Sequence, residues 1–383
     1  MHRAWWVRPL NAVLAPVLGG RPGPIDDPPA PDQPGGPVDD PRAPDRPGGP
    51  VDGAFAGDMR VLHDALAAAP LTPIGRCGAR SEVRRRLVNE AALRRLPPEV
   101  FAQPVDRPIV VTGLPRTGTT LLHGLLARHP VARAPLLWEL MHPLARGPIA
   151  RRRARWSVTC MARFYHAAVP VLRDLHPLAP VVPEECLFAL PHHLGHLART
   201  PMPGYRRWWE ARPADDDYRH LRRYLQALQW RRPARRWVLK SPFHLHHLDA
   251  LLRVFPDATI VHTRRDPVRA LTSGCQLVEA IRLLQNEPSD PATIGPEWLD
   301  IWALAVRRSS AVRAAHPDRF LDVDYHRLAD DPSGTAAEIW RGLDDAAAGE
   351  VAPATAARRR RHQRTPREYG LDPAEVRARL SPR

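Results

Sequence analysis

A short apolar run that leads directly into a glycine-bearing loop constrains the fold of this chain more than any other feature. Ile109-Val110-Val111 predicts a short buried strand, and leucines at helical spacing follow at residues 121–126. The loop between them reads Gly113-Leu114-Pro115-Arg116-Thr117-Gly118-Thr119-Thr120. Backbone N–H groups of such a loop, together with the N-terminus of the following helix, form a cradle for phosphate-like anions. The sequence therefore predicts an anion-binding site where this strand turns into a helix.

Strand and helix patterns alternate along much of the remaining chain. Apolar runs at residues 237–239, 259–262 and 320–323 predict further strands, and leucines at helical spacing predict helices at 218–228 and 245–252. Strands that alternate with helices imply a parallel sheet whose two faces are both covered. We therefore predict an α/β, P-loop-like three-layer fold with a central parallel sheet flanked by helices. Ligands are then expected at the carboxyl ends of the strands.

The N-terminal region differs in composition from the rest of the chain. Proline and glycine occupy 18 of the 34 positions from residue 20 to residue 53. This stretch lacks the apolar side chains whose burial would offset the entropy lost on ordering. We predict that residues 1–57 are a disordered, Pro/Gly-rich extension and that residues 58–383 form one folded domain with a basic C-terminal tail.

Length and cysteine spacing narrow the class of protein. With 383 residues, 44% of them hydrophobic, the chain is long enough to bury a large core. Its 4 cysteines lie far apart without a CxxC pair, which argues against a disulfide framework and against a cysteine zinc site. No apolar run approaches the roughly 18 to 20 residues that a membrane-spanning helix needs. We expect a cytoplasmic protein without a membrane span.

The basic residues of the chain are almost all arginine. Lysine and arginine together number 56 against 41 acids, for a net charge of +15, yet Lys240 is the only lysine. A surface position tolerates either cation, whereas a site that needs a compact, flexible ammonium does not. Lys240 directly follows the strand predicted at 237–239, at the edge where ligands are expected. Lys240 is therefore a candidate catalytic residue, and a leftover surface lysine is the alternative.

The loop and a second segment resemble those of a known enzyme family. Residues 115–120 resemble the 5′-phosphosulfate loop of sulfotransferases that use 3′-phosphoadenosine 5′-phosphosulfate (PAPS). In that family an arginine just after a strand and a serine eight residues later bind the 3′-phosphate, and Arg265 and Ser273 match this spacing. The resemblance implies a donor site made of these residues: Pro115, Arg116, Thr117, Gly118, Thr119, Thr120, Arg265 and Ser273.

A third segment extends the resemblance. Residues 237–245, which contain Lys240, resemble the strand end of tyrosylprotein and heparan-type sulfotransferases, where the lysine contacts the transferring sulfuryl group. Residues from about 105 to 345 follow the general bacterial sulfotransferase pattern. Three segments in the same order imply a PAPS-dependent sulfotransferase, in which Lys240 and Arg116 neutralise charge on the sulfuryl and bridging oxygens.

The sequence leaves two candidates for the base that takes the proton of the acceptor hydroxyl. Glu139 follows the first predicted helix after the loop, where tyrosylprotein-type enzymes carry a glutamate base. Glu184 and Glu185 are adjacent acids in an otherwise apolar, histidine-rich stretch. A carboxylate at a cleft contributes about 10²- to 10⁴-fold as a general base. Each of these glutamates can instead form a structural ion pair with a nearby arginine, so both candidates stay open.

Two groups of histidines, at residues 192–196 and 244–247, contain helical pairs with a spacing that suits metal ligands. No HExxH pattern accompanies them, and the family resemblance implies a donor that needs no metal, so we predict no metal site. The expected substrates are PAPS as co-substrate and a hydroxyl-bearing acceptor, which is a small molecule, a lipid or a glycan.

Two other functions compete with sulfuryl transfer. The loop has the spacing of a Walker A loop, which favours a P-loop nucleotide kinase or hydrolase, but Thr119 stands where such enzymes carry lysine. The net charge of +15 and the arginine run at 358–361 favour a non-catalytic polyanion- or nucleic-acid-binding protein. A polyanionic donor and the arginine bias explain the basic composition more simply, so we expect no nucleic-acid partner.

Overall fold

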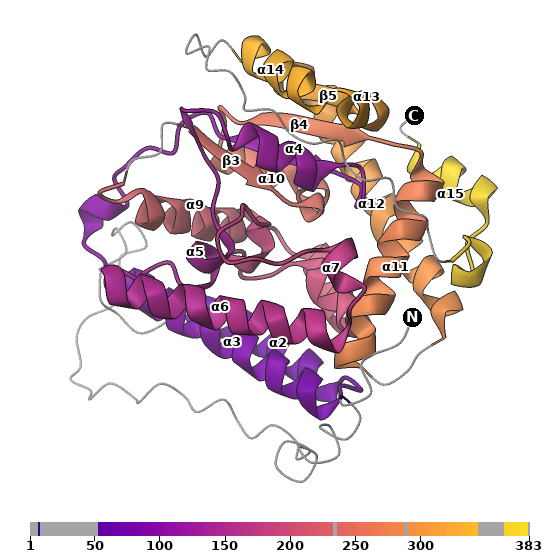
Figure 1. Ribbon diagram of the computed structural model, residues 1–383, viewed down its shortest axis with the longest axis horizontal. Helices are drawn as coiled ribbons and strands as arrows, with labels where there is room; N and C mark the ends of the chain where they lie inside the picture. Colours follow the sequence, from indigo (N-terminus) through magenta and orange to yellow (C-terminus); the bar gives the residue numbers. More distant parts are fainter. Residues whose placement is uncertain (1–6, 8–52, 233–235, 287–289, 344–363, 382–383) are drawn as a thin grey trace.

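A five-stranded parallel sheet, in the order β2-β3-β1-β4-β5, lies at the centre of the molecule (Figure 1). The computed structural model describes residues 7, 53–232, 236–286, 290–343 and 364–381. The strands are β1 (Ile109–Gly113), β2 (Ala132–Arg133), β3 (Arg236–Lys240), β4 (Thr259–Arg264) and β5 (Phe320–Asp324). The four strands predicted from the sequence are confirmed, and the short edge strand β2 joins them.

The register of the sheet brings three strand ends together. Val111 of β1 lies opposite Lys240 of β3 on one side and opposite Val261 of β4 on the other. Because all the pairs are parallel, the carboxyl ends of these strands meet at one edge of the sheet. The loop after β1, the lysine at the end of β3 and the arginines after β4 therefore lie along the same edge.

Helices cover both faces of the sheet, so the predicted α/β class with three layers is confirmed. Ile109 and Val111 pack into one hydrophobic cluster with α4 and α14, whereas Val110 packs into the cluster on the opposite face. The alternation follows from the pleat, which points successive side chains to opposite faces. The α-helices are α2 (Gly53–Ala68), α3 (Pro73–Arg94), α4 (Thr119–Leu126), α5 (Leu137–Met141), α6 (Pro148–Ala168), α7 (Leu172–Leu175), α8 (Pro203–Ala211), α9 (Asp215–Gln229), α10 (Leu248–Val254), α11 (Pro267–Gln285), α12 (Ile294–Ala315), α13 (Tyr325–Asp330), α14 (Pro332–Gly342) and α15 (Pro373–Leu380).

The helix expected at 245–252 is divided into two pieces. A 3₁₀-helix, η4 (Pro242–His246), begins where the Ser241 hydroxyl accepts a hydrogen bond from the Phe243 N–H at 3.3 Å. The backbone at His247 then leaves the helical region, with φ −141° and ψ 41°, before α10 begins. A capping serine followed by proline starts a separate turn directly after β3, and the leucine pattern alone does not reveal it.

The terminal segments fall partly outside the described residues. Helix α2 begins at Gly53, four residues before the expected end of the N-terminal extension at 57, and the rest of that extension except Val7 lies outside the described residues. Val7 is fully buried in a hydrophobic cluster with Ile74 and Leu284. The arginine run at 358–361 also lies outside the described residues. The division of the chain at residue 57 stays a prediction.

The described part of the chain contains no helix whose length and hydropathy would let it cross a bilayer.

Candidate active site

The loop between β1 and α4 has the backbone of an anion cradle. Gly118, the N-cap of α4, has φ 93°, and Gly113 has φ 152° with Thr263 so close that a Cβ would lie 2.4 Å from its hydroxyl. Both positions therefore require glycine. Arg116 also has a positive φ, 66°, which is uncommon for a residue with a Cβ. The loop thus combines three positive φ angles directly before the N-terminus of α4, at the edge of the sheet.

Contacts with neighbouring elements hold this loop in place. The Thr117 and Thr263 hydroxyl oxygens are 2.6 Å apart, and the Thr117 hydroxyl also donates to the Leu114 carbonyl at 2.6 Å. Pro115 packs against α11, where a Cβ at Gly274 would lie 3.1 Å from its ring. Thr263 was not among the residues singled out from the sequence. The sequence feature that could have identified Thr263 is its place at the end of a strand.

The three side chains expected around the phosphates are brought together. Arg116 donates from Nε to the Ser273 hydroxyl at 3.2 Å, and its Nη1 donates to the Leu175 carbonyl of α7 at 2.5 Å. Arg265 donates from Nη1 to the Arg116 carbonyl at 2.7 Å. Its guanidinium also lies 3.9 Å from the centre of the Tyr325 ring. Residues from the loop, β4 and α11 therefore form one basic cluster.

Lys240 is fully buried at the carboxyl end of β3. Its ammonium nitrogen lies 2.7 Å from Glu185 Oε1, 3.4 Å from the Thr120 hydroxyl and 3.7 Å from Glu184 Oε1. Thr119 and Thr120 are the first two residues of α4, so Lys240 lies beside the helix start that follows the anion loop. The single lysine of the chain therefore joins the loop to the pair of glutamates.

Glu184 and Glu185 have different partners. Glu184 Oε2 lies 3.5 Å from His176 Nε2. Burial raises the pKa of Glu184, but His176 and Lys240 outweigh burial and lower it to about 2. Burial lowers the pKa of His176, and the carboxylate of Glu184 outweighs burial and raises it. Glu184 is thus committed to an ion pair, whereas the shortest contact of the Glu185 side chain is with Lys240.

Glu139 lies in a separate set of contacts. Its Oε1 accepts from Arg133 Nη2 at 3.1 Å and lies 3.8 Å from Arg232. Its Oε2 accepts from the Leu136 N–H at 3.2 Å, which caps the N-terminus of α5. The side chain is buried. These contacts are those of a structural ion pair and helix cap, so the structure brings Glu185 to Lys240 and holds Glu139 elsewhere.

Two buried histidines lie on α4 and η4, the elements that adjoin β3. His123 Nε2 lies 3.1 Å from the Val238 carbonyl, and burial and the charge of Lys240 lower its pKa to about 3. His244 Nδ1 lies 3.0 Å from the Tyr218 hydroxyl, and burial lowers the pKa of His244 to about 3. Both rings are therefore neutral near pH 7, and Lys240 is the cation at this end of β3.

One group of potential metal ligands occurs among the described residues. Ligand atoms of Glu82, His193 and His196 all lie within 4.8 Å of one another. Arg86, however, lies 2.7 Å from the Glu82 carboxylate and 3.0 Å from His193 Nε2, and Arg85 contacts the same carboxylate at 3.0 Å. These guanidiniums already balance the carboxylate charge and would repel a cation. The absence of a metal stays a prediction.

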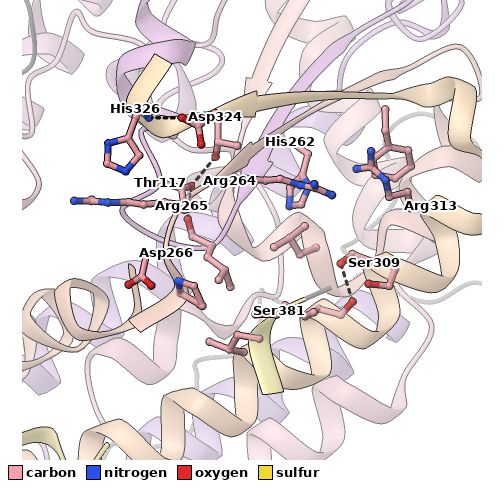
Figure 2. Close-up of a pocket in the computed structure, with 18 residues that line it drawn as sticks. Thr117, His262, Arg264, Arg265, Asp266, Ser309, Arg313, Asp324, His326 and Ser381 are labelled. Carbon is pink, nitrogen blue, oxygen red and sulfur yellow. Dashed lines mark hydrogen bonds between the residues drawn. The ribbon is translucent and has the colours of Figure 1, made fainter. Parts of the chain in front are cut away.

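A cavity of about 300 Å³ borders the loop on the side of β4, β5 and α12 (Figure 2). Thr117 and Arg265 connect it to the basic cluster, and Arg264 and Arg313 add further positive charge to its lining. Figure 2 shows Ser309 of α12 and Ser381 on another side. The cavity therefore opens at the same sheet edge as the anion loop and is lined by both arginines and hydroxyl groups.

Known proteins resemble the chain over its whole folded part. The profile of the sulfotransferase family matches residues 108–345. The solved structure of sulfotransferase STF1 from Mycobacterium tuberculosis is 30% identical, with a TM-score of 0.74, over 98% of this chain and 98% of that chain. Sulfotransferase STF9 from Mycobacterium avium is 26% identical, with a TM-score of 0.75, over 86% of this chain and 90% of its own.

A curated relative adds a named substrate class. Omega-hydroxy-beta-dihydromenaquinone-9 sulfotransferase Stf3 of Mycobacterium bovis is 27% identical over 272 residues. The match covers 65% of this chain and 65% of the length of that relative. The protein of the same name from Mycobacterium tuberculosis matches equally.

Proposed function

The chain belongs to the sulfotransferase family, and on that premise we propose that it moves a sulfuryl group from PAPS to an acceptor hydroxyl. One observation carries the proposal. The buried ammonium of Lys240 lies 3.4 Å from a hydroxyl at the start of α4 and 2.7 Å from the carboxylate of Glu185. A cation, an anion loop and a carboxylate therefore meet at one point, where an acceptor can lose its proton beside a bound sulfuryl group.

The donor is proposed to lie along the carboxyl edge of the sheet. The backbone of residues 115–120 and the N-terminus of α4 bind the 5′-phosphosulfate. Arg265 and Ser273 bind the 3′-phosphate, since both already contact Arg116 and lie one loop away from the anion cradle. Arg116, placed between the two groups, supplies a guanidinium that suits phosphate and sulfate oxygens.

The reaction is an in-line displacement at sulfur. The acceptor oxygen forms a new S–O bond while the bond between sulfur and the bridging oxygen of the 5′-phosphate breaks, and 3′-phosphoadenosine 5′-phosphate leaves. The acceptor proton goes to a carboxylate. Lys240, which is fully buried, and Arg116 stabilise the negative charge that develops on the sulfuryl and bridging oxygens.

Glu185 is the better supported base of the candidates. Glu184 is held ionised by His176 and Lys240, and Glu139 caps α5 and pairs with Arg133. Glu185 lies at Lys240 and keeps 12% of its side chain exposed, so an acceptor can reach it.

A lipid with a free hydroxyl is the acceptor class we favour. The relative Stf3 acts, by its name, on an omega-hydroxy-dihydromenaquinone, which carries its hydroxyl on an apolar chain. In this chain the segment that carries Glu185 pairs with the residues before α5, and α5 buries Leu137 and Trp138 beside Val158 of α6. A cytoplasmic location and the lack of a nucleic-acid partner remain predictions.

Direct transfer to a lipid alcohol tests the proposal. The purified chain is incubated with PAPS and a hydroxyl-terminated isoprenoid quinone in detergent, and the sulfate ester is sought by mass spectrometry. We expect the ester with the wild-type chain and, after the same time, about 10²-fold less or lower with Lys240→Ala. Failure of the wild-type chain to bind 3′-phosphoadenosine 5′-phosphate in calorimetry would overturn the donor assignment. Magnesium-dependent turnover of ATP would instead favour the kinase or hydrolase alternative.

A further inference from the structure

Exposed apolar side chains gather on helix α6 and on the segment that follows α7. Among the described residues, the large hydrophobic side chains exposed to solvent are Val88, Ile149, Trp156, Val181 and Val182. Ile149 and Trp156 of α6 are the most exposed of these, at 71% and 69%. Tryptophan is highly buried on average in folded proteins, so a side chain this exposed on a regular helix suggests a surface that contacts a partner.

These two side chains share one face of α6 with arginines. Ile149 and Trp156 are seven residues apart, which places them one above the other on a helix. Arg152, Arg153 and Arg163 fall on the same face and are exposed. The opposite face is buried, through Ala154, Val158 and Ala162. We call Ile149, Arg152, Arg153, Trp156, Cys160 and Arg163 the outer face of α6.

Charge identifies the kind of partner. The sequence of α6, Pro148–Ala168, contains no aspartate or glutamate, so its outer face is purely basic and apolar. A helix with arginines beside tryptophan and a branched aliphatic residue is suited to the interface of a bilayer, where the arginines meet anionic headgroups and the apolar side chains enter the acyl boundary. A nucleic acid would use the arginines but has no comparable use for Ile149.

We propose that the outer face of α6 docks the protein on the surface of an anionic lipid bilayer. Figure 1 shows α6 running along the outside of the molecule near α3, and Ile149, Arg152, Arg153 and Trp156 of its outer face are exposed. A shallow groove of about 650 Å³ adjoins it, lined by Ile149 and Arg153 together with His142 and Arg146. An apolar chain leaving the bilayer has room there.

Helix α5 connects α6, which carries the outer face, to the proposed active site. Ala154 and Val158 of α6 pack against Leu137 and Trp138 of α5. The segment that carries the glutamates pairs with the start of α5, since the Glu184 N–H donates to the Pro135 carbonyl at 3.0 Å. A lipid alcohol would therefore pass from the bilayer to Glu185 across adjacent elements. This route rests on the proposed function, whereas bilayer binding itself does not.

Sedimentation with vesicles tests the docking without any donor. The full chain is mixed with vesicles of phosphatidylglycerol and phosphatidylcholine in equal parts, or of phosphatidylcholine alone. We expect binding to the anionic vesicles and little to the neutral ones. The binding should weaken in about 0.5 M salt without vanishing, because the apolar contribution is not screened. No binding to anionic vesicles would overturn the proposal.

Two variants separate the contributions of the outer face. Arg152→Gln/Arg153→Gln should weaken vesicle binding about 30-fold, since each basic residue near an anionic membrane contributes about 1 kcal/mol. Ile149→Ala/Trp156→Ala should weaken it about tenfold or more and remove the part that survives salt. The matched control is Arg207→Gln/Arg222→Gln, which removes two exposed arginines from α8 and α9. Its binding should stay within about twofold of the wild type.

The outcomes distinguish the possible partners. All these side chains are exposed, so the variants should melt as the wild type does. If Ile149→Ala/Trp156→Ala binds vesicles like the wild type, or if the control loses as much as the outer-face variant, general basic charge explains the binding and the docking face is wrong. A docking variant that still sulfates a detergent-dispersed alcohol would separate this proposal from the proposed catalytic function.

Discussion

The donor side and the acceptor side of the candidate site are specified in different ways. The proposed donor side consists of the loop 113–120, Lys240, Arg265 and Ser273, all of which lie at strand ends or on the helices that follow them. The proposed acceptor side consists of α5, α7 and the segment 176–186, which carries Glu185. It reaches the site through long-range contacts, such as the bond from Arg116 to the Leu175 carbonyl and the bridge between Leu136 and Pro183.

This difference shows which functional residues can be located from the sequence alone. Parallel register fixes which strand ends meet, so motifs after strands are placed by the sheet itself. The position of a carboxylate on a connecting segment does not follow from the register of the strands. Glu139 and Glu185 are equally plausible by residue type, yet one pairs with Arg133 and the other with Lys240. The predictions below test whether the donor side stabilises the transferring sulfuryl group and the acceptor side takes the proton, as their contacts indicate.

The largest effect is expected from Glu185, and Glu139 serves as the glutamate for comparison. Glu185→Gln keeps the shape of the side chain but cannot accept a proton, so kcat should fall about 10²- to 10⁴-fold while donor Kd changes little. Glu139→Gln should keep kcat within about twofold and lower the free energy of unfolding by about 1–3 kcal/mol, because a buried ion pair is lost. Steady-state kinetics and urea unfolding measure both.

The opposite result would contradict the assignment of Glu185 as the base. If Glu139→Gln loses turnover and Glu185→Gln stays active, the proton goes to the α5 carboxylate, and the contacts of Glu185 with Lys240 are only structural. Unfolding of each variant by urea serves as the control, because it shows whether lost activity reflects a lost fold.

Lys240 should give the next largest effect, on the donor side. A guanidinium is planar and wider than an ammonium, and Lys240 is fully buried, so Lys240→Arg should not be conservative. We expect kcat to fall about 10²-fold or more in Lys240→Arg and Lys240→Ala, with modest changes in donor Kd. Wild-type turnover in Lys240→Arg would withdraw its catalytic role.

The 3′-phosphate should account for a smaller change. If Arg265 and Ser273 bind it, PAPS should bind more tightly than adenosine 5′-phosphosulfate by about 10- to 100-fold, because one charge-assisted hydrogen bond contributes about 1.5–3 kcal/mol. Ser273→Ala should narrow the gap between the two ligands. Calorimetry measures each Kd, and equal affinities would remove the basis for this part of the donor side.

The smallest effect is a pH dependence of stability that arises on the acceptor side. Glu184 has a lowered pKa, so its stabilisation is complete above its ordinary value of about 4.3 and is lost as pH falls toward 2. His176 has a raised pKa, so its stabilisation is complete below about 6.5 and is lost as pH rises through the raised value. The Glu184–His176 pair therefore stabilises the fold most between about pH 4.3 and about pH 6.5.

His176→Asn isolates this contribution. Compared with the wild type, the variant should be less stable at about pH 5.5, and this difference should shrink at about pH 9, because the charge of His176 is lost as pH rises through its raised pKa. Urea unfolding at both pH values gives the free energies. A loss of equal size at both would mean that His176 stabilises the segment by packing rather than by its charge.

The sequence was sufficient for most of the sheet, and it named the residues that we propose for the donor side. Strand–loop–helix units have a local signature: Arg265 lies directly after β4, and Ser273 lies on α11, the helix that follows. It could not place the short edge strand β2, which has only two residues, or the division at His247 between η4 and α10. It also gave no hint of His176, whose importance arises only from its contact with a glutamate eight residues away. Contacts of this kind depend on tertiary packing and leave no local pattern.

A crystal structure with bound 3′-phosphoadenosine 5′-phosphate tests the central claim most directly. The account predicts the 5′-phosphate on the N–H groups of residues 117–120 with the Lys240 ammonium beside it, and the 3′-phosphate on Arg265 and Ser273. Arg116 should then exchange its contact with the Ser273 hydroxyl for one with the ligand, and Glu185 should face the open side of the 5′-phosphate. A nucleotide bound away from Lys240, or with its 3′-phosphate far from Arg265, would contradict the account.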